Sequence, residues 1–181
     1  MSQDTPNNNG PDCRYLLRKE GDNPLIIIGC NPSTANEGVS DPTMIKVSKF
    51  CQINGYNGYI MLNLYPQIAS DVEDIPPHID YHIHNVNMEI IERTIKENNE
   101  SDILFAFGGL IRQRNYLYDP CLKSINKIIN NNNINRLSLN GDIFMHPLHF
   151  GFPRITENVI AEGRLVLVNF NLQEYIDRFN Q

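Results

Sequence analysis

Short apolar segments, each followed at once by polar, glycine or proline residues, constrain the fold of this chain most strongly. The segments are residues 25–28, 59–62, 103–107 and 143–145. Apolar runs of this length between turn-forming residues are typical of strands that are buried on both faces. Helix-compatible segments alternate with them, at residues 42–54, 85–98 and 122–129. This alternation predicts an α/β fold, specifically a three-layer α/β/α sandwich with a mainly parallel central sheet of about four or five strands.

The remaining segments suggest a single domain. Residues 13–18 and 164–170 are strand-like, a short helix is expected from Leu110, and residues 172–179 read as a helix. Asp41 and Pro42 suit the N-cap and first position of the helix at 42–54, and the asparagine run at 130–133 suits an exposed connector. Residues 1–12 are expected to form a flexible tail, and residues 13–181 one α/β domain.

Composition narrows the function classes. The formal net charge of -6 argues against strong non-specific binding of nucleic acid. It leaves open the hypothesis of a local basic face that binds nucleic acid. Its candidate residues are Arg14, Arg18, Lys19, Lys46, Lys49, Arg112, Arg114 and Arg154. No signal peptide or membrane segment is visible, so we expect a cytoplasmic protein. Cys13, Cys30, Cys51 and Cys121 form no CxxC pair, so we expect reduced thiols and no bound metal.

Several common catalytic motifs are absent from the sequence. It contains no GxGxxG, Walker loop, GxSxG or HExxH. This excludes the most common NTPases, Rossmann enzymes, lipase-like hydrolases and zinc proteases. His78, His82 and His84 have no matching cysteine or carboxylate set, so a solvated loop explains them better than a metal site.

The candidate site lies where the apolar strands end. In parallel sheets, ligands bind beyond the carboxyl ends of the strands. The residues expected there are Asn31, Pro32, Ser33, Asn63, Tyr65, Gly108, Gly109, His146 and Pro147. A carboxamide such as Asn63 offers adjacent donor and acceptor groups that match the edge of a pyrimidine or purine base.

Each of these residues also has a purely structural explanation. Asn31 before a proline is a common turn former, and Asn63 could cap the end of its strand. His146 could donate to a loop carbonyl. Gly108 and Gly109 could cradle a phosphate or simply form a tight turn.

The order of these segments is similar to that in a known superfamily. Residues 27–33, 61–64, 103–109 and 145–148 resemble successive motifs of the uracil-DNA glycosylase superfamily. Residues 13–153 more closely resemble an uncharacterised bacterial and phage family, known only as domain of unknown function 1643. Its hallmarks are matched by Arg14-Tyr-Leu-Leu, Asn31-Pro-Ser-Thr-Ala, Asp41-Pro-Thr, Asn63-Leu and His146-Pro-Leu.

The glycosylase resemblance implies a role for each site residue. Asn31 would position water, Asn63 would read the base, and His146 would stabilise the departing base, without a metal or cofactor. Pro32, Ser33, Tyr65, Gly108 and Pro147 would complete the substrate site. Leu148 and Phe150 would be candidate wedges that enter the DNA stack.

The chain departs from the superfamily pattern at three positions. Asn31 replaces the acidic residue of the most active uracil glycosylases, and an amide orients water without accepting its proton. Leu148 stands where a phosphate-holding serine usually follows His-Pro. Ser33 replaces a bulky tyrosine, which leaves room for a 5-substituted pyrimidine.

Three hypotheses follow. The first is N-glycosidic hydrolysis of a pyrimidine, with or without a 5-substituent, in DNA, with the base flipped into the site. The second is hydrolysis or modification of a free nucleoside or nucleotide, which the acidic net charge favours. The third is a non-catalytic nucleotide- or nucleic-acid-binding domain, which the missing carboxylate and serine favour.

Overall fold

The computed structural model describes residues 11–33, 42–69, 72–129 and 132–179. Within these ranges a six-stranded sheet has the order β1-β3-β2-β4-β5-β6. The strands are β1 (Leu17–Lys19), β2 (Pro24–Gly29), β3 (Gly58–Asn63), β4 (Ile103–Phe105), β5 (Ile134–Leu139) and β6 (Leu165–Asn169). The helices are α1 (Pro42–Ile53), α2 (Tyr81–Glu97), α3 (Lys123–Ile128), α4 (Glu157–Ala161) and α5 (Leu172–Phe179). Short helical turns are η1 (Val72–Asp74), η2 (Gly108–Gln113) and η3 (Leu117–Leu122).

The α/β class is confirmed, but the sheet is larger and more mixed than expected. The four middle strands, β3, β2, β4 and β5, are parallel, while β1 and β6 pair antiparallel at the two edges. The expected strand at residues 143–145 is wrong: this segment is irregular, and its Ile143 and Met145 side chains are 63% and 75% exposed. The fourth parallel strand is β5 instead, directly after the asparagine run.

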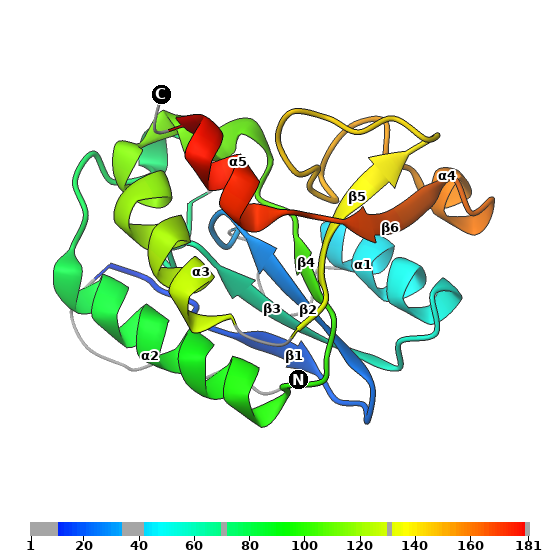
Figure 1. The fold of residues 1–181 in the computed structure, drawn as a ribbon, viewed down its shortest axis with the longest axis horizontal. Helices are drawn as coiled ribbons and strands as arrows, with labels where there is room; N and C mark the ends of the chain where they lie inside the picture. Colours follow the sequence, from blue (N-terminus) through cyan, green and yellow to red (C-terminus); the bar gives the residue numbers. More distant parts are fainter. Residues whose placement is uncertain (1–10, 34–41, 70–71, 130–131, 180–181) are drawn as a thin grey trace.

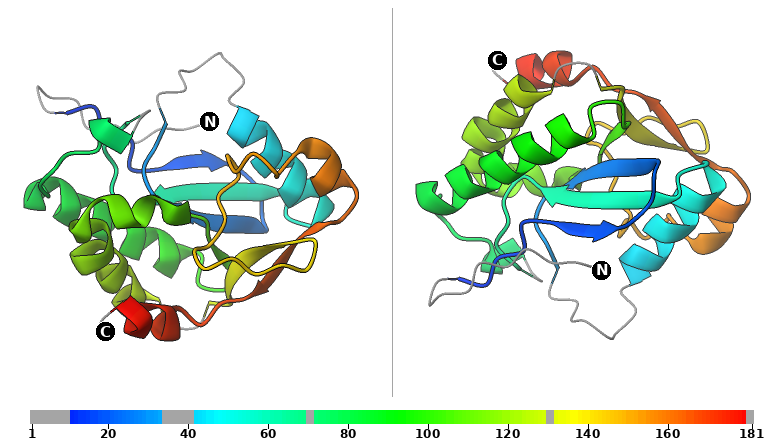
Figure 2. Two further views of the ribbon diagram at one scale, coloured as in Figure 1. Left: turned by 90° about the horizontal axis from the view of Figure 1, so that it is seen from above. Right: turned by 90° about the horizontal axis from the view of Figure 1, so that it is seen from below.

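Apolar residues on both faces of the sheet build two cores. In β2, Ile26 and Ile28 face the core under α2, α3 and α5, while Leu25 and Ile27 face the core under α1 and α4. All four side chains are fully buried. Figure 1 shows the two helix groups on opposite sides of the sheet, and Figure 2 shows the same layers from above and below. The alternation of strand side chains therefore produces the layered arrangement.

Helix α2 begins earlier than the expected residue 85. The Asp80 carboxylate caps it by accepting hydrogen bonds from the backbone N–H groups of His82 and Ile83, at 2.8 and 3.2 Å. His84 is consequently a buried helical residue whose Nδ1 lies 3.5 Å from Cys121 Sγ, not a loop residue. The expected cap at Asp41 lies outside the described residues.

The other helices follow the sequence closely. Helices α1, α3 and α5 begin and end within one residue of the expected limits, and η2 contains Leu110. Helix α4 was not expected from the sequence; the Thr156 hydroxyl caps it by accepting from Val159 N at 3.3 Å. All four cysteines are free thiols. None of the helices in the described ranges has the length and apolar character required to cross a membrane.

Acid is expected to destabilise the fold. Burial lowers the pKa of His84, His146 and His149 below the ordinary 6.5, helped at His149 by Lys46. The unfolded chain therefore binds more protons than the folded chain once the pH falls below about 6.5. We expect the free energy of unfolding to drop by up to about 1.4 kcal/mol per pH unit per histidine in that window, and to level off above it.

Urea unfolding at pH 7.5, 6.5 and 5.5 measures this dependence. His84→Gln should flatten it, while the same change at the exposed His82 serves as the control. Equal stability of the unchanged protein at all three pH values would contradict the prediction.

Candidate functional site

The carboxyl ends of β2 and β3 lie side by side and carry two of the expected site residues. Gly29 pairs with Asn63 in the parallel register. Beyond the strands, Leu64 N donates to Gly29 O at 3.0 Å and Tyr65 N donates to Cys30 O at 3.1 Å. The pairing thus continues past the strand ends and brings the Asn31 and Asn63 segments to one edge of the sheet.

The Asn31 side chain is oriented by its own donor group. Its Nδ2 donates to the carbonyl oxygens of Pro32 and Ala69, at 3.1 and 3.0 Å. No group among the described residues donates to its Oδ1. Within the described part of the chain, the amide therefore uses its nitrogen to hold the loop, and its oxygen accepts no hydrogen bond.

Asn31→Asp is expected to destabilise the protein by about 1–3 kcal/mol at neutral pH. The carboxylate cannot donate to the Pro32 and Ala69 carbonyls and would face their oxygens. Urea unfolding at pH 7.5 measures the loss, with Asn115→Asp at an exposed position as the matched control. Equal losses in the two variants would contradict the account of Asn31.

Asn63 is nearly buried, at 6% exposed, but neither of its side-chain polar atoms is among the fully buried, unpartnered atoms of the described residues. Its Oδ1 lies over Gly29, where an added Cβ would come within 2.8 Å of it. Its backbone is held from α2, because Asn87 Nδ2 donates to the carbonyls of Asn63 and Leu64 at 3.0 and 3.3 Å. Asn87 is fully buried, and sequence reasoning missed it. An asparagine on the apolar stripe of a helix was the available signal.

The two residues after Asn31 are held through their backbone carbonyls. Pro32 is buried and its carbonyl accepts from Ala69 N at 3.0 Å. Ser33 is exposed, and its carbonyl accepts from Arg14 Nη2 at 2.8 Å. Of the basic residues considered as a nucleic-acid face, Arg14 therefore has a structural contact beside the candidate site.

Tyr65 is held within the core at this edge. It is 1% exposed, its ring packs edge-on against Tyr116 with centroids 5.1 Å apart, and its hydroxyl accepts from Asp80 N at 3.1 Å. The structure thus gives Tyr65 a scaffolding contact that links the end of β3 to the start of α2.

The end of β4 meets the loop that carries His146 and Pro147, called the His-Pro loop below. Gly108 N donates to Pro147 O at 2.8 Å, and Gly108 has a φ of +66°, which favours glycine. A Cβ on Gly108 would lie 2.6 Å from the His149 ring. Gly109 stands close to His146, since a Cβ built there would be 3.8 Å from its ring. These glycines let the loop approach the strand end closely.

His146 is positioned by aromatic residues of α5. Its Nδ1 lies 2.8 Å from the Tyr175 hydroxyl, and its ring stacks on Phe179 with centroids 5.7 Å apart. Its Nε2 is buried and has no hydrogen-bond partner in the described part of the chain. Burial, Arg112 and Arg136 lower the pKa of His146, so the imidazole is neutral at pH 7. Tyr175, another residue that sequence reasoning missed, comes from an element 29 positions further along the chain.

Leu148 and Phe150, the candidate wedges, are buried at 5% and 2% exposed. Phe150 packs edge-on against Phe50 of α1, with centroids 5.4 Å apart. Core packing accounts for both side chains in this structure. A wedge role would require the loop to withdraw them from the core.

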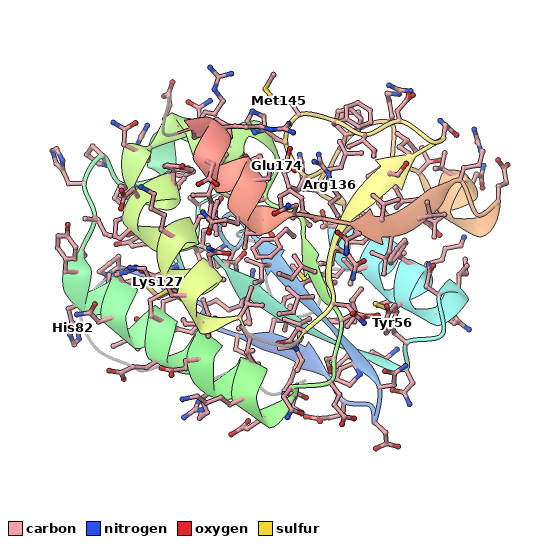
Figure 3. The ribbon with its side chains drawn as sticks, in the orientation of Figure 1. Tyr56, His82, Lys127, Arg136, Met145 and Glu174 are labelled. Carbon is pink, nitrogen blue, oxygen red and sulfur yellow. The ribbon has the colours of Figure 1, made fainter. Side chains whose placement is uncertain are left out.

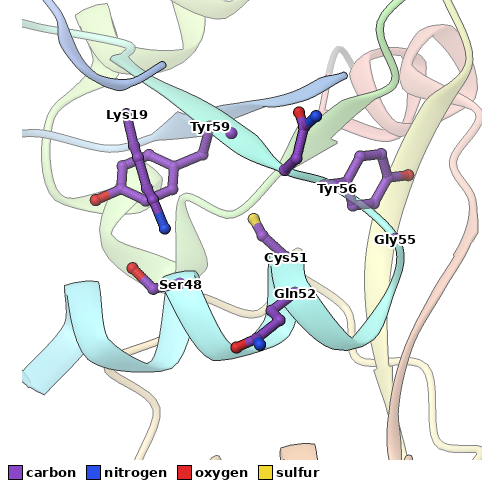
Figure 4. Close-up of a pocket in the computed structure, with 9 residues that line it drawn as sticks. Lys19, Ser48, Cys51, Gln52, Gly55, Tyr56 and Tyr59 are labelled. Atoms are coloured by element: carbon purple, nitrogen blue, oxygen red, sulfur yellow. The ribbon is translucent and has the colours of Figure 1, made fainter. Parts of the chain in front are cut away.

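A cavity lies at the other end of the sheet, by the amino end of β3. It has a volume of about 440 Å³ and opens between the end of α1 and the start of β3 (Figure 4). Its lining comprises Lys19, Ser48, Cys51, Gln52, Gly55, Tyr56, Asn57, Gly58 and Tyr59. It contains none of the expected site residues. The prediction that Asn31, Asn63 and His146 share one pocket stays a prediction, because residues 34–41, which follow the Asn31 segment, lie outside the described residues.

Comparisons with known proteins place the chain in a family without assigning an activity. No curated protein and no solved structure matches it. A family model described as "Protein of unknown function (DUF1643)" matches residues 14–149, which is three quarters of the chain. The chain therefore belongs to this family of proteins of unknown function.

Proposed function

We propose that this protein is a uracil-DNA-glycosylase-like enzyme that hydrolyses the N-glycosidic bond of a pyrimidine, including 5-substituted pyrimidines, in DNA. The observation that carries the proposal is Asn63. Its nearly buried carboxamide stands at the carboxyl end of a central parallel strand, where it can present a donor and an acceptor to a ligand. A flipped pyrimidine offers the complementary acceptor and donor on its pairing edge. The parallel strands in the middle of the sheet also support a glycosylase-like fold.

Asn31 orients the attacking water in this proposal. Its nitrogen is occupied by the Pro32 and Ala69 carbonyls, which leaves Oδ1 to accept a hydrogen bond from water. The water then directs a lone pair at the sugar carbon as the bond to the base breaks. An amide cannot take the proton, so the proton that the water loses passes to solvent as the C–O bond forms. The base leaves as an anion, and the reaction therefore depends mainly on stabilising that leaving base.

His146 stabilises the negative charge that develops on the departing base. Burial raises the pKa of the Tyr175 phenol, so its hydroxyl stays protonated, and in this proposal it donates to Nδ1, 2.8 Å away. The ring proton then resides on Nε2, which has no hydrogen-bond partner in the described ranges. A neutral N–H donor held in this way acts as an oxyanion-type stabiliser.

Release of free base tests the proposal. The substrates are oligonucleotides with one uracil or one 5-substituted uracil, single- and double-stranded, and the corresponding free nucleosides. Base release from an oligonucleotide supports the proposal, and release from the 5-substituted ones supports a roomy site at Ser33. No release from any substrate would overturn it.

A free nucleoside or nucleotide is the second candidate substrate, and the net charge of -6 favours it. A strongly acidic chain repels the DNA polyanion more than it repels a small ligand. Release from nucleosides but not from oligonucleotides would establish this second function in place of the first.

A further inference from the structure

Arg136 is a buried cation on β5, the strand that precedes the segment with His146. It lies on β5 (Figure 3), opposite Phe105 of β4, and its exposed fraction is 8%. Its guanidinium carbon sits 5.1 Å from the centroid of the Phe170 ring, and its Nη2 donates to the carbonyl of Phe144. Its Nε is buried without a hydrogen-bond partner among the described residues.

No carboxylate in the described ranges forms an ion pair with this guanidinium. The Glu174 carboxylate on the neighbouring helix α5 is paired with Arg178. The Phe170 ring and the Phe144 carbonyl are therefore the groups that compensate this charge, while burial lowers the pKa of Arg136. A buried charge without an ion-pair partner is expensive, so a structure that keeps one usually places it there for a ligand of opposite charge.

A second arginine adds to the positive field. Arg112 is exposed on η2, three residues after Gly109, and a Cβ built on Gly109 would lie 3.8 Å from the His146 ring. Arg112 and Arg136 both lower the pKa of His146. Burial raises the pKa of Tyr175, and both arginines act in the opposite direction on that pKa. The net result is a local cationic cluster, Arg112 and Arg136 beside His146 and Tyr175, on a chain whose net charge is -6.

We propose that Arg136 and Arg112 form a binding site for a phosphate group, carried by a nucleotide or by the nucleic-acid backbone, next to His146. A guanidinium presents adjacent N–H groups in a planar fork that matches two phosphate oxygens. The phosphate accepts from the unpartnered Nε of Arg136 and supplies the missing negative charge, while Arg112 attracts it from the surface. The site does not depend on the release of a base.

Calorimetric titration of the full chain tests the site. The probes are inorganic phosphate, thymidine, thymidine 5′-monophosphate and a short single-stranded oligonucleotide. We expect saturable binding of the phosphate-bearing probes, weakened about 10-fold by Arg112→Ala and by Arg136→Lys. Arg164→Ala, at an exposed arginine on the turn before β6, is the matched control and should bind as the unchanged protein does.

The probes separate the two sources of phosphate. Tighter binding of the monophosphate than of the oligonucleotide identifies a free nucleotide, and the reverse identifies the backbone. If Arg136→Lys fails to fold, the exposed Arg112→Ala variant still decides the question. Absence of phosphate binding, or unchanged binding in Arg112→Ala, overturns the proposal. A protein that binds phosphate but releases no base fails only the proposed glycosylase function.

Discussion

His146→Ala is expected to slow base release about 100- to 1,000-fold, because removing one oxyanion-type donor typically costs that much. The His146 Nδ1 lies 2.8 Å from the Tyr175 hydroxyl, while its Nε2 is buried without a hydrogen-bond partner among the described residues. Single-turnover assays on a uracil-containing oligonucleotide measure the loss in the chemical step.

Two further variants make this result specific. Tyr175→Phe keeps the ring packing but removes the hydroxyl that selects the tautomer, so its rate should fall less than that of His146→Ala. His82→Ala removes an exposed histidine of α2 and should leave the rate unchanged. If folded His146→Ala released base as fast as the unchanged protein, His146 would have no catalytic role.

Asn63→Ala is expected to lower kcat/KM for base release by about 10- to 100-fold and to weaken discrimination between pyrimidines. The alanine removes both the donor and the acceptor that face the pairing edge of the base. Competition between uracil and cytosine oligonucleotides measures the discrimination. Asn158→Ala, at an exposed asparagine of α4, is the matched control.

A second variant probes how Asn63 is held. Asn87→Leu removes the amide whose Nδ2 donates to the Asn63 and Leu64 carbonyls, while residue 63 itself is unchanged. We expect this variant to lower kcat/KM as well. Unchanged discrimination in Asn63→Ala would show that this carboxamide reads no base.

Local patterns were sufficient to predict most of the fold. The strands β2, β3 and β4 are short apolar runs between turn-forming residues, and this pattern arises when a strand is covered on both faces. Helices α1 and α5 begin and end within one residue of the expected limits because proline, capping residues and apolar spacing mark them. The same reasoning placed Asn31 and Asn63 at one edge, since parallel strands bring their carboxyl ends together.

Strand β5 was not predicted, because polar residues interrupt its apolar residues although the strand is buried. Leu137 and Leu139 face the core under α1 and α4, but Arg136 and Ser138 occupy the other face and are also buried. A buried arginine breaks the apolar run by which a central strand is recognised. Its position depends on Phe170 and the Phe144 carbonyl, groups that only the folded chain brings to it.

The residues that support the site also act through contacts that only the folded chain makes. Asn87 reaches the Asn63 carbonyl from 24 residues away, and Tyr175 reaches His146 from 29 residues away. Neither residue belongs to a sequence motif, because each acts through a contact between elements and not through neighbours along the chain. The spacing of residues in the sequence could therefore identify the groups at the strand ends, whereas the packing of α2 and α5 onto the sheet determines how those groups are oriented.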